Sequence, residues 1–126
     1  MARILIIDDD APLRGLLVDT LELAGHEVYQ AEDGAQGVEV FKIAGADVVV
    51  TDMIMPGQEG IETIGQLRKL APKLPIIAMS GNMQHSSIYL QLANKLGATR
   101  TLAKPFTGHQ FLAIIDAVLA PPKPEA

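Results

Sequence analysis

The chain has 126 residues, 48% of them hydrophobic, which is enough for one compact domain and too few for two. It has no cysteine, which excludes disulfides and thiolate chemistry, and no apolar stretch of the roughly 18 residues that a membrane span needs. Its formal net charge of −5 argues against direct binding to nucleic acid, which favours a basic surface.

Short apolar runs alternate with amphipathic stretches five times along the chain. The runs predict five β-strands, at residues 3–7, 27–31, 47–51, 75–79 and 99–103. Three of them are rich in Ile and Val with little alternation, which is typical of strands covered on both faces. Residues 1–7 lead directly into the first strand, so we expect no signal peptide, a cytoplasmic location and no membrane partner.

Each run is followed by a helical period. Leu13, Leu17, Leu21 and Ala24 mark the first helix, with Pro12 in its first turn and Gly25 as its stop. The other four helices are marked by Val38 and Phe41, by Ile61, Ile64 and Leu67, by Ile88, Leu92 and Leu96, and by Phe111, Ile114, Ile115, Val118 and Leu119. We expect a single domain over residues 1–120 and a Pro-rich tail or linker stub at 121–126.

Five strand–helix units in series predict an α/β fold, a doubly wound parallel sheet with helices on both faces. In such sheets ligands bind beyond the carboxyl ends of the strands. The residues that end the strands are therefore the candidates for a functional site. They are Asp8, Asp9 and Asp10, then Asp52, Ser80 and Lys104.

These side chains suit the transfer of a phosphoryl group with the help of a hard cation. Mg²⁺ prefers oxygen ligands and usually keeps several waters, so two or three carboxylates suffice. An aspartate can act as nucleophile and form an acyl phosphate, while an ammonium and a hydroxyl stabilise the phosphoryl oxygens. Alone, each residue has an ordinary interpretation as a solvated turn, a helix N-cap or an exposed lysine. Their joint occurrence at four strand ends favours the phosphoryl site.

The sequence closely resembles the receiver domains of two-component response regulators over about residues 3–120. The matching segments are ILIIDDD (4–10), VVVTDMIMPGQEG (48–60), PIIAMSG (75–81), LGA (96–98) and LAKPF (102–106). The resemblance implies a flavodoxin-like sheet of five strands in the order 2-1-3-4-5, as in the chemotaxis receiver.

The resemblance also implies a role for the residues around the phosphoryl group. Asp52 resembles the phosphoacceptor. Ser80 resembles the hydroxyl residue, and Lys104 the lysine, that bind the phosphoryl oxygens. The peptide bond before Pro105 is expected to be cis.

For the metal, the resemblance implies a set of oxygen ligands. Asp9 resembles the direct Mg²⁺ ligand, together with Asp52, and Asp8 resembles its neighbour that acts through water. Ile54 would offer its backbone carbonyl. Asp10 matches no required role, and we expect it to be a helix cap or a solvated carboxylate.

The chain departs from the family pattern at the positions that transmit the signal. Relatives carry an aromatic residue at the position of Thr101, which acts as a switch together with the hydroxyl residue. The segment between Ser80 and Lys104 is longer than in the family, and the added length falls within residues 81–87. We therefore expect Ser80 to transmit the signal mainly by ordering residues 81–87, and Thr101 to contribute less.

As a receiver, the chain would accept a phosphoryl group from a histidine kinase or a histidine phosphotransfer protein. It would then change its binding to a downstream protein target or an output domain. We expect self-catalysed phosphorylation and dephosphorylation and no other enzymatic activity.

Two other functions fit the sequence less well than a receiver does. A hydrolase of the haloacid-dehalogenase kind needs a second aspartate two residues after the nucleophile, where this chain has Ile54. A degenerate, phosphate-independent interaction module would lack an acidic position or the lysine, and all of these are present.

Overall fold

The computed structural model describes residues 2–53, 60–81 and 86–120, with residues 86–90 described by their backbone alone. These residues form β1 (Arg3–Ile7), α1 (Ala11–Leu23), β2 (Glu27–Ala31), α2 (Gly34–Ala44), β3 (Val48–Asp52), α3 (Gly60–Leu70), β4 (Ile76–Ser80), α4 (Ser86–Leu96), β5 (Arg100–Ala103) and α5 (Gly108–Leu119). The strands build one parallel sheet in the order β2-β1-β3-β4-β5, which confirms the predicted fold and strand order. Within the described part of the chain, no helix has the length and apolar character to cross a membrane.

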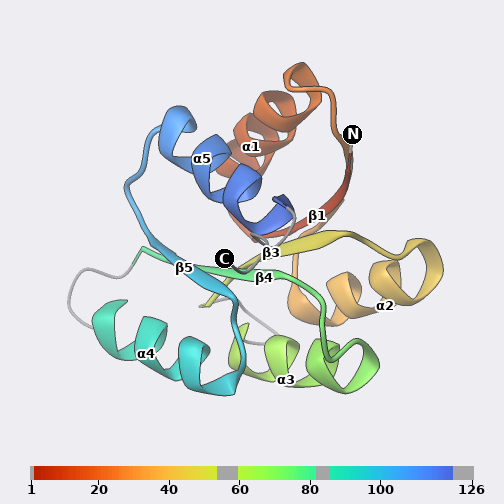
Figure 1. Ribbon diagram of the computed structural model, residues 1–126, viewed down its shortest axis with the longest axis vertical. Coiled ribbons are helices and arrows are strands. Elements are labelled where there is room, and N and C mark those ends of the chain that lie inside the picture. Colours follow the sequence, from red (N-terminus) through yellow and green to blue (C-terminus); the bar gives the residue numbers. More distant parts are fainter. Residues whose placement is uncertain (1, 54–59, 82–85, 121–126) are drawn as a thin grey trace, which may run out of the picture.

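The sheet lies between two layers of helices, with α1 and α5 on one face and α2, α3 and α4 on the other (Figure 1). Successive side chains of a strand point to opposite faces. In β1, Ile4 and Ile6 therefore belong to the core beneath α1 and α5, whereas Leu5 and Ile7 belong to the core beneath the other three helices. All four side chains are completely buried, which explains why β1 is apolar at consecutive positions.

Three strands begin one residue later than predicted. At the start of β3, the Asp47 carboxylate accepts a hydrogen bond from the Arg3 backbone N–H at 2.8 Å, so this side chain bonds to the neighbouring chain segment just before the strand begins. At their other ends, β3 and β4 include Asp52 and Ser80 as their last residues. The two candidate site residues are thus fixed by the hydrogen bonds of the sheet.

The predicted apolar stripes of α1 and α4 need correction. Ala24 is exposed and caps the end of α1, and Val18 is buried in its place. In α4, Leu92 and Leu96 are 40% and 41% exposed, and Ala93 is the residue that packs into the core. A small alanine permits close approach of the helix to the sheet, which leaves the two leucines on its flank.

Candidate functional site

The candidate residues meet at the carboxyl edge of the sheet, as predicted, because hydrogen bonding between strands continues past their ends. The Asp8 N–H donates to the Ala31 carbonyl at 3.1 Å, next to the end of β1. The Lys104 N–H donates to the Ser80 carbonyl at 2.8 Å, next to the end of β5. The peptide bond between Lys104 and Pro105 is cis, as predicted. Residues that are far apart in sequence are thereby placed at one edge.

Three carboxylates gather at this edge. Asp8, Asp9 and Asp52 each offer an oxygen atom, and these atoms lie within 4.8 Å of one another. Asp8 is completely buried and Asp52 is 7% exposed, whereas Asp9 is exposed. A donor set made only of carboxylate oxygens fits a hard divalent cation such as Mg²⁺, which would also relieve the repulsion among the three charges.

The two carboxylates that follow β1 are held very differently. Both oxygens of Asp8 have partners within the protein: Oδ1 accepts from the Asp10 N–H at 3.0 Å and Oδ2 from Lys104 Nζ at 3.1 Å. The Asp9 carboxylate has no hydrogen-bond or ion-pair partner among residues 2–53, 60–81 and 86–120. Asp9 is thus more available to a cation than Asp8. This difference fits a direct ligand at Asp9 and a neighbour that acts through water at Asp8.

Asp10 has a structural place beside these residues. It is the N-cap of α1, and its side chain accepts a hydrogen bond from the Leu13 N–H at 3.1 Å. An N-cap carboxylate satisfies one of the unpaired N–H groups at the start of a helix. This confirms the expectation of a helix cap and separates Asp10 from the carboxylates that could bind a metal.

Lys104 brings a positive charge between the carboxylates. Its Nζ lies 3.1 Å from Asp8 Oδ2 and 3.5 Å from Asp52 Oδ2, and its side chain is 18% exposed. The aliphatic stem of Lys104 passes close to Gly81, where a Cβ atom would lie 3.0 Å from Lys104 Cδ. The glycine after β4 therefore leaves the room that the lysine needs to reach the acidic cluster.

Asp52 sits at the centre of this arrangement. Its Oδ1 accepts a hydrogen bond from the Met53 N–H at 2.9 Å. Burial raises the pKa of the Asp52 carboxyl from 3.8 to about 6, the ammonium group of Lys104 acts to lower this pKa, and the Asp8 carboxylate acts to raise it. At neutral pH Asp52 is therefore an ionised carboxylate in a largely desolvated place, next to a cation, as a nucleophile for phosphoryl transfer would need to be.

The sequence matches the family described as the response regulator receiver domain over residues 4–116. The chain belongs to this family. It is 34% identical over 122 residues to the DNA-binding transcriptional regulator NtrC of Rhizobium meliloti, a match that covers 97% of this chain and 25% of that protein. It is 33% identical over 118 residues to the phosphate regulon transcriptional regulatory protein PhoB of Pseudomonas aeruginosa, covering 92% of this chain and 51% of that protein. This receiver thus spans between a quarter and about half of the length of these relatives.

Solved structures of receivers have the same fold. A response regulator receiver domain protein from Clostridium thermocellum superposes with a TM-score of 0.87 at 30% sequence identity, covering 94% of both chains. The chemotaxis protein CheY4 of Vibrio cholerae superposes with a TM-score of 0.87 at 31% identity, covering 94% of this chain and 99% of that chain. Receiver domains of response regulators act in phosphorylation-dependent signalling, so the class of function predicted from the sequence is confirmed.

The two predicted switch residues of this receiver lie on one face of the sheet. Thr101 pairs in register with Ala78, two residues before Ser80 on β4. The Ser80 hydroxyl is buried and has no hydrogen-bond partner among the described residues. A buried hydroxyl without a partner raises the free energy of the state that contains it, so a state that supplies an acceptor is favoured. With respect to the described residues, Ser80 thus offers an unused donor at the same edge of the sheet as Asp52 and Lys104.

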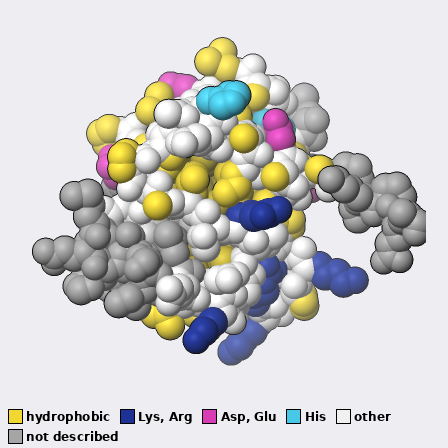
Figure 2. All heavy atoms as spheres, turned by 60° about the vertical axis from the view of Figure 1, so that its left-hand side comes forward, with side chains coloured by type: hydrophobic (Ala, Val, Ile, Leu, Met, Phe, Trp, Pro, Cys, Tyr) yellow, Lys and Arg dark blue, Asp and Glu magenta, His cyan; other side chains and the backbone are white. Residues whose placement is uncertain are grey.

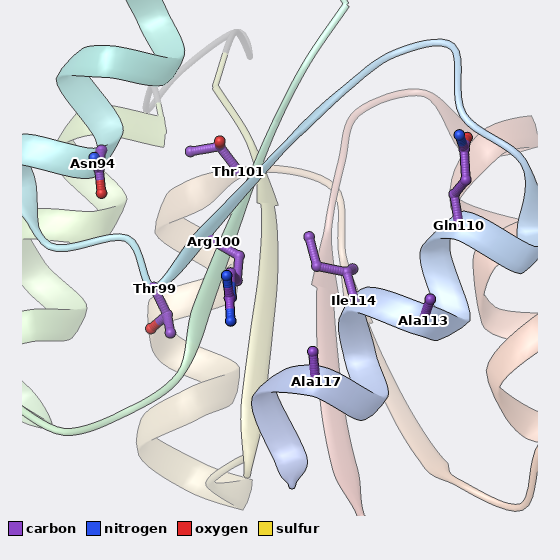
Figure 3. Close-up of a pocket in the computed structure, with 8 residues that line it drawn as sticks. All are labelled: Asn94, Thr99, Arg100, Thr101, Gln110, Ala113, Ile114 and Ala117. Atoms are coloured by element: carbon purple, nitrogen blue, oxygen red, sulfur yellow. The ribbon is translucent and has the colours of Figure 1, made fainter. Parts of the chain in front are cut away.

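Thr101 lines a surface groove of about 630 Å³ between α4 and α5. Figure 3 shows Asn94 of α4 on one side, Ala113, Ile114 and Ala117 of α5 on the other, and Thr101 on β5 pointing toward the α4 side. Figure 2 turns this side of the molecule forward, with apolar side chains gathered in its middle and Lys and Arg side chains below them. The small threonine lines this groove and does not fill it.

Two residues that support the site have no role in the sequence-based prediction. At Gly60, which begins α3, a Cβ atom would lie 2.4 Å from the Asp52 carbonyl oxygen and 2.7 Å from Met53 Cα, so only glycine permits this close approach. The guanidinium of Arg14 donates to the Asp8 carbonyl at 2.7 Å. A cation in the first turn of a helix is unusual, because the helix dipole disfavours it, and this signal could have drawn attention to Arg14.

Two parts of the predicted site lie outside the described residues: the backbone carbonyl of Ile54 and residues 82–85 of the predicted switch segment. The predicted Pro-rich tail or linker stub at 121–126 lies outside them as well. The predicted roles of Ile54 and of the segment 81–87 therefore stay predictions.

The raised pKa of Asp52 predicts how the stability of the metal-free protein depends on pH. Between pH 3.8 and about 6 the native carboxyl keeps a proton that the unfolded chain has lost, so the free energy of unfolding should fall as the pH rises through this window. Asp52→Asn has no titrating carboxyl at this position, so its free energy of unfolding should not fall for this reason across the window. At pH 7 its free energy of unfolding should therefore exceed that of the wild type by about 2–3 kcal/mol. Below the unfolded pKa of 3.8 the gain should vanish. Urea unfolding in EDTA across this range would measure it, and a gain independent of pH would contradict the assignment.

Proposed function

We propose that this receiver accepts a phosphoryl group on Asp52 from a phosphohistidine of a histidine kinase or a histidine phosphotransfer protein, in a reaction that depends on Mg²⁺. One observation carries the proposal. At the end of a central strand, Asp52 lies with Lys104 Nζ 3.5 Å from its Oδ2 and with carboxylate oxygens of Asp8 and Asp9 within 4.8 Å. This is the combination of nucleophile, cation and oxygen ligands that aspartyl phosphorylation requires.

In the proposed reaction a carboxylate oxygen of Asp52 attacks the phosphorus atom of the donor. The new O–P bond forms as the P–N bond to the donor imidazole breaks, and the imidazole leaves with the bonding electron pair and takes up a proton. Lys104 and the buried Ser80 hydroxyl would bind phosphoryl oxygens of the product. When bound by Asp9 and Asp52, with Asp8 behind them, Mg²⁺ would neutralise charge on the transferring group.

We propose that the acyl phosphate then changes how the domain binds a downstream protein or an output domain. The Ser80 hydroxyl supports this part, because it is buried without a hydrogen-bond partner among residues 2–53, 60–81 and 86–120, and a phosphoryl group on Asp52 would supply an acceptor. The greater length of the relatives supports an output domain, since NtrC and PhoB are described as transcriptional regulators. We propose no activity on other substrates; the chemistry is the self-catalysed gain and loss of this phosphoryl group.

The experiment that tests this proposal uses phosphoramidate as a small donor with a P–N bond. In MgCl₂ the chain should gain one phosphoryl group by intact-mass spectrometry, and in excess EDTA it should gain none. The adduct should be lost on treatment with hydroxylamine, because an acyl phosphate is cleaved by this nucleophile whereas a phosphoserine is not. A chain that stays unmodified in MgCl₂ would refute the proposal and favour the phosphate-independent interaction module.

A further inference from the structure

We propose that Arg14 is a positioning residue for the Mg²⁺ site, and that it acts through the peptide group that joins Asp8 to Asp9. The inference rests on the proposed function, since it concerns the same metal. The guanidinium of Arg14 donates from Nη1 to the Asp8 carbonyl at 2.7 Å and from Nε to Gln30 Oε1 at 3.0 Å. It therefore ties α1 to β2 across the end of β1.

Asp9 is the carboxylate that depends on this contact. It is exposed, and its side chain has no bonding partner in the described parts of the chain, so its direction is set by its backbone. The carbonyl oxygen of Asp8 belongs to the planar peptide group that ends at the Asp9 Cα atom. When Arg14 holds this oxygen, it fixes the orientation of that plane, and with it the direction in which the Asp9 side chain leaves the backbone.

The other bonds of Asp8 show why the effect should fall on the metal and not on the fold. The Asp8 N–H is held by the Ala31 carbonyl, and its carboxylate by the Asp10 N–H and by Lys104 Nζ. These three bonds stay in place without Arg14. What is lost is the restraint on the carbonyl side of Asp8, which faces Asp9.

The position of Arg14 in its helix supports a specific role. α1 begins at Ala11, so Arg14 lies in the first turn, where the dipole of the helix disfavours a positive charge. A guanidinium with several fixed donors offsets this cost when it can donate to two acceptors at once. Arg14 donates to the Asp8 carbonyl and to the Gln30 side chain. Its charge thus lies at the carboxyl edge of the sheet, which also carries the acidic cluster.

The test compares three variants. Arg14→Met removes both hydrogen bonds and the charge. Arg14→Lys keeps the charge on a single nitrogen atom and lacks the two separate nitrogen atoms with which Arg14 reaches the Asp8 carbonyl and Gln30. Arg3→Met is the matched control. Arg3 also donates to a backbone carbonyl, that of Ala44 at 3.4 Å, and pairs with Glu27 of β2 at 3.7 Å, but at the amino end of the sheet. Arg3→Met therefore makes the same change in charge as Arg14→Met, but away from the site.

Mg²⁺ binding would be measured by titration calorimetry with MgCl₂ alone, and phosphorylation by phosphoramidate as a function of MgCl₂ concentration. Arg14→Met should raise the dissociation constant for Mg²⁺ about tenfold, as is typical when a group that orients a metal ligand is removed. The rate at saturating MgCl₂ should stay that of the wild type, because Asp52 and Lys104 are unaffected. Arg14→Lys should recover part of the affinity, and Arg3→Met should bind Mg²⁺ as the wild type does.

Wild-type Mg²⁺ affinity in Arg14→Met would overturn the inference, and so would equal weakening in Arg14→Met and Arg3→Met, which would show an effect of net charge alone. If Arg14→Met does not fold in EDTA, Gln30→Leu decides the question. This variant removes only the partner of Arg14 Nε, and it should also weaken Mg²⁺ binding. An unchanged affinity for Mg²⁺ in Gln30→Leu would overturn the inference. A wild-type chain that binds Mg²⁺ but takes no phosphoryl group would refute the proposed function and leave the calorimetric comparison to decide the role of Arg14.

Discussion

Asp52→Asn should abolish phosphorylation of this receiver by acetyl phosphate while the chain stays folded. The substitution is nearly isosteric, and it removes the carboxylate oxygen that would attack phosphorus. The amide oxygen of asparagine can still accept the hydrogen bond that the Met53 N–H donates to Asp52 Oδ1 at 2.9 Å, so the end of β3 should keep its geometry. Intact-mass spectrometry after incubation in MgCl₂ would show an adduct on the wild type and none on the variant.

Asp10→Asn is the matched control for this experiment. Asp10 lies at the same edge of the sheet, but its carboxylate caps α1, and asparagine is an equally good N-cap. This variant should therefore be phosphorylated like the wild type. An undiminished adduct on Asp52→Asn would assign the phosphoryl group to another residue.

Mg²⁺ should stabilise the folded receiver, and Asp9→Ala should remove most of this effect. The carboxylate oxygens of Asp8, Asp9 and Asp52 lie within 4.8 Å of one another, and the single charge of Lys104 offsets their repulsion only in part, so a bound cation would reduce the repulsion further. At about one hundred times its dissociation constant, a ligand that binds only the native state adds about 2.7 kcal/mol to the free energy of unfolding. For a domain of this size such a gain corresponds to a rise in Tm of about 10 °C.

Thermal unfolding followed by circular dichroism, with MgCl₂ or with EDTA, would measure this shift. Because Asp9 is exposed and has no partner in the structure as described, Asp9→Ala should fold normally in EDTA. Asp19→Ala makes the same change in charge on an exposed part of α1 and should keep the full shift. Equal shifts in the wild type and Asp9→Ala would remove Asp9 from the metal site.

The pattern of residue types alone determined the fold class and the residues at the carboxyl edge of the sheet, and the resemblance to the receiver family supplied the order of the strands. The first two features depend on patterns that are local in the chain. A strand covered on both faces is apolar at consecutive positions, as in β1, and its end is marked by the first charged residue, such as Asp8. The roles of Asp52 and Lys104 came from the resemblance of whole segments to the receiver family, which the comparisons confirm as the family of this chain.

Only the tertiary structure decided how these residues differ from one another. Asp8 and Asp9 are neighbours in sequence, yet Asp9 is exposed, whereas Asp8 is buried and bonded through both oxygens, one of them to Lys104, which is 96 residues away. The pKa of Asp52 and the contact of Arg14 with the Asp8 carbonyl likewise depend on which groups surround them in space. Burial and hydrogen bonding between distant segments are properties of the packed chain, and no local pattern of residue types contains them.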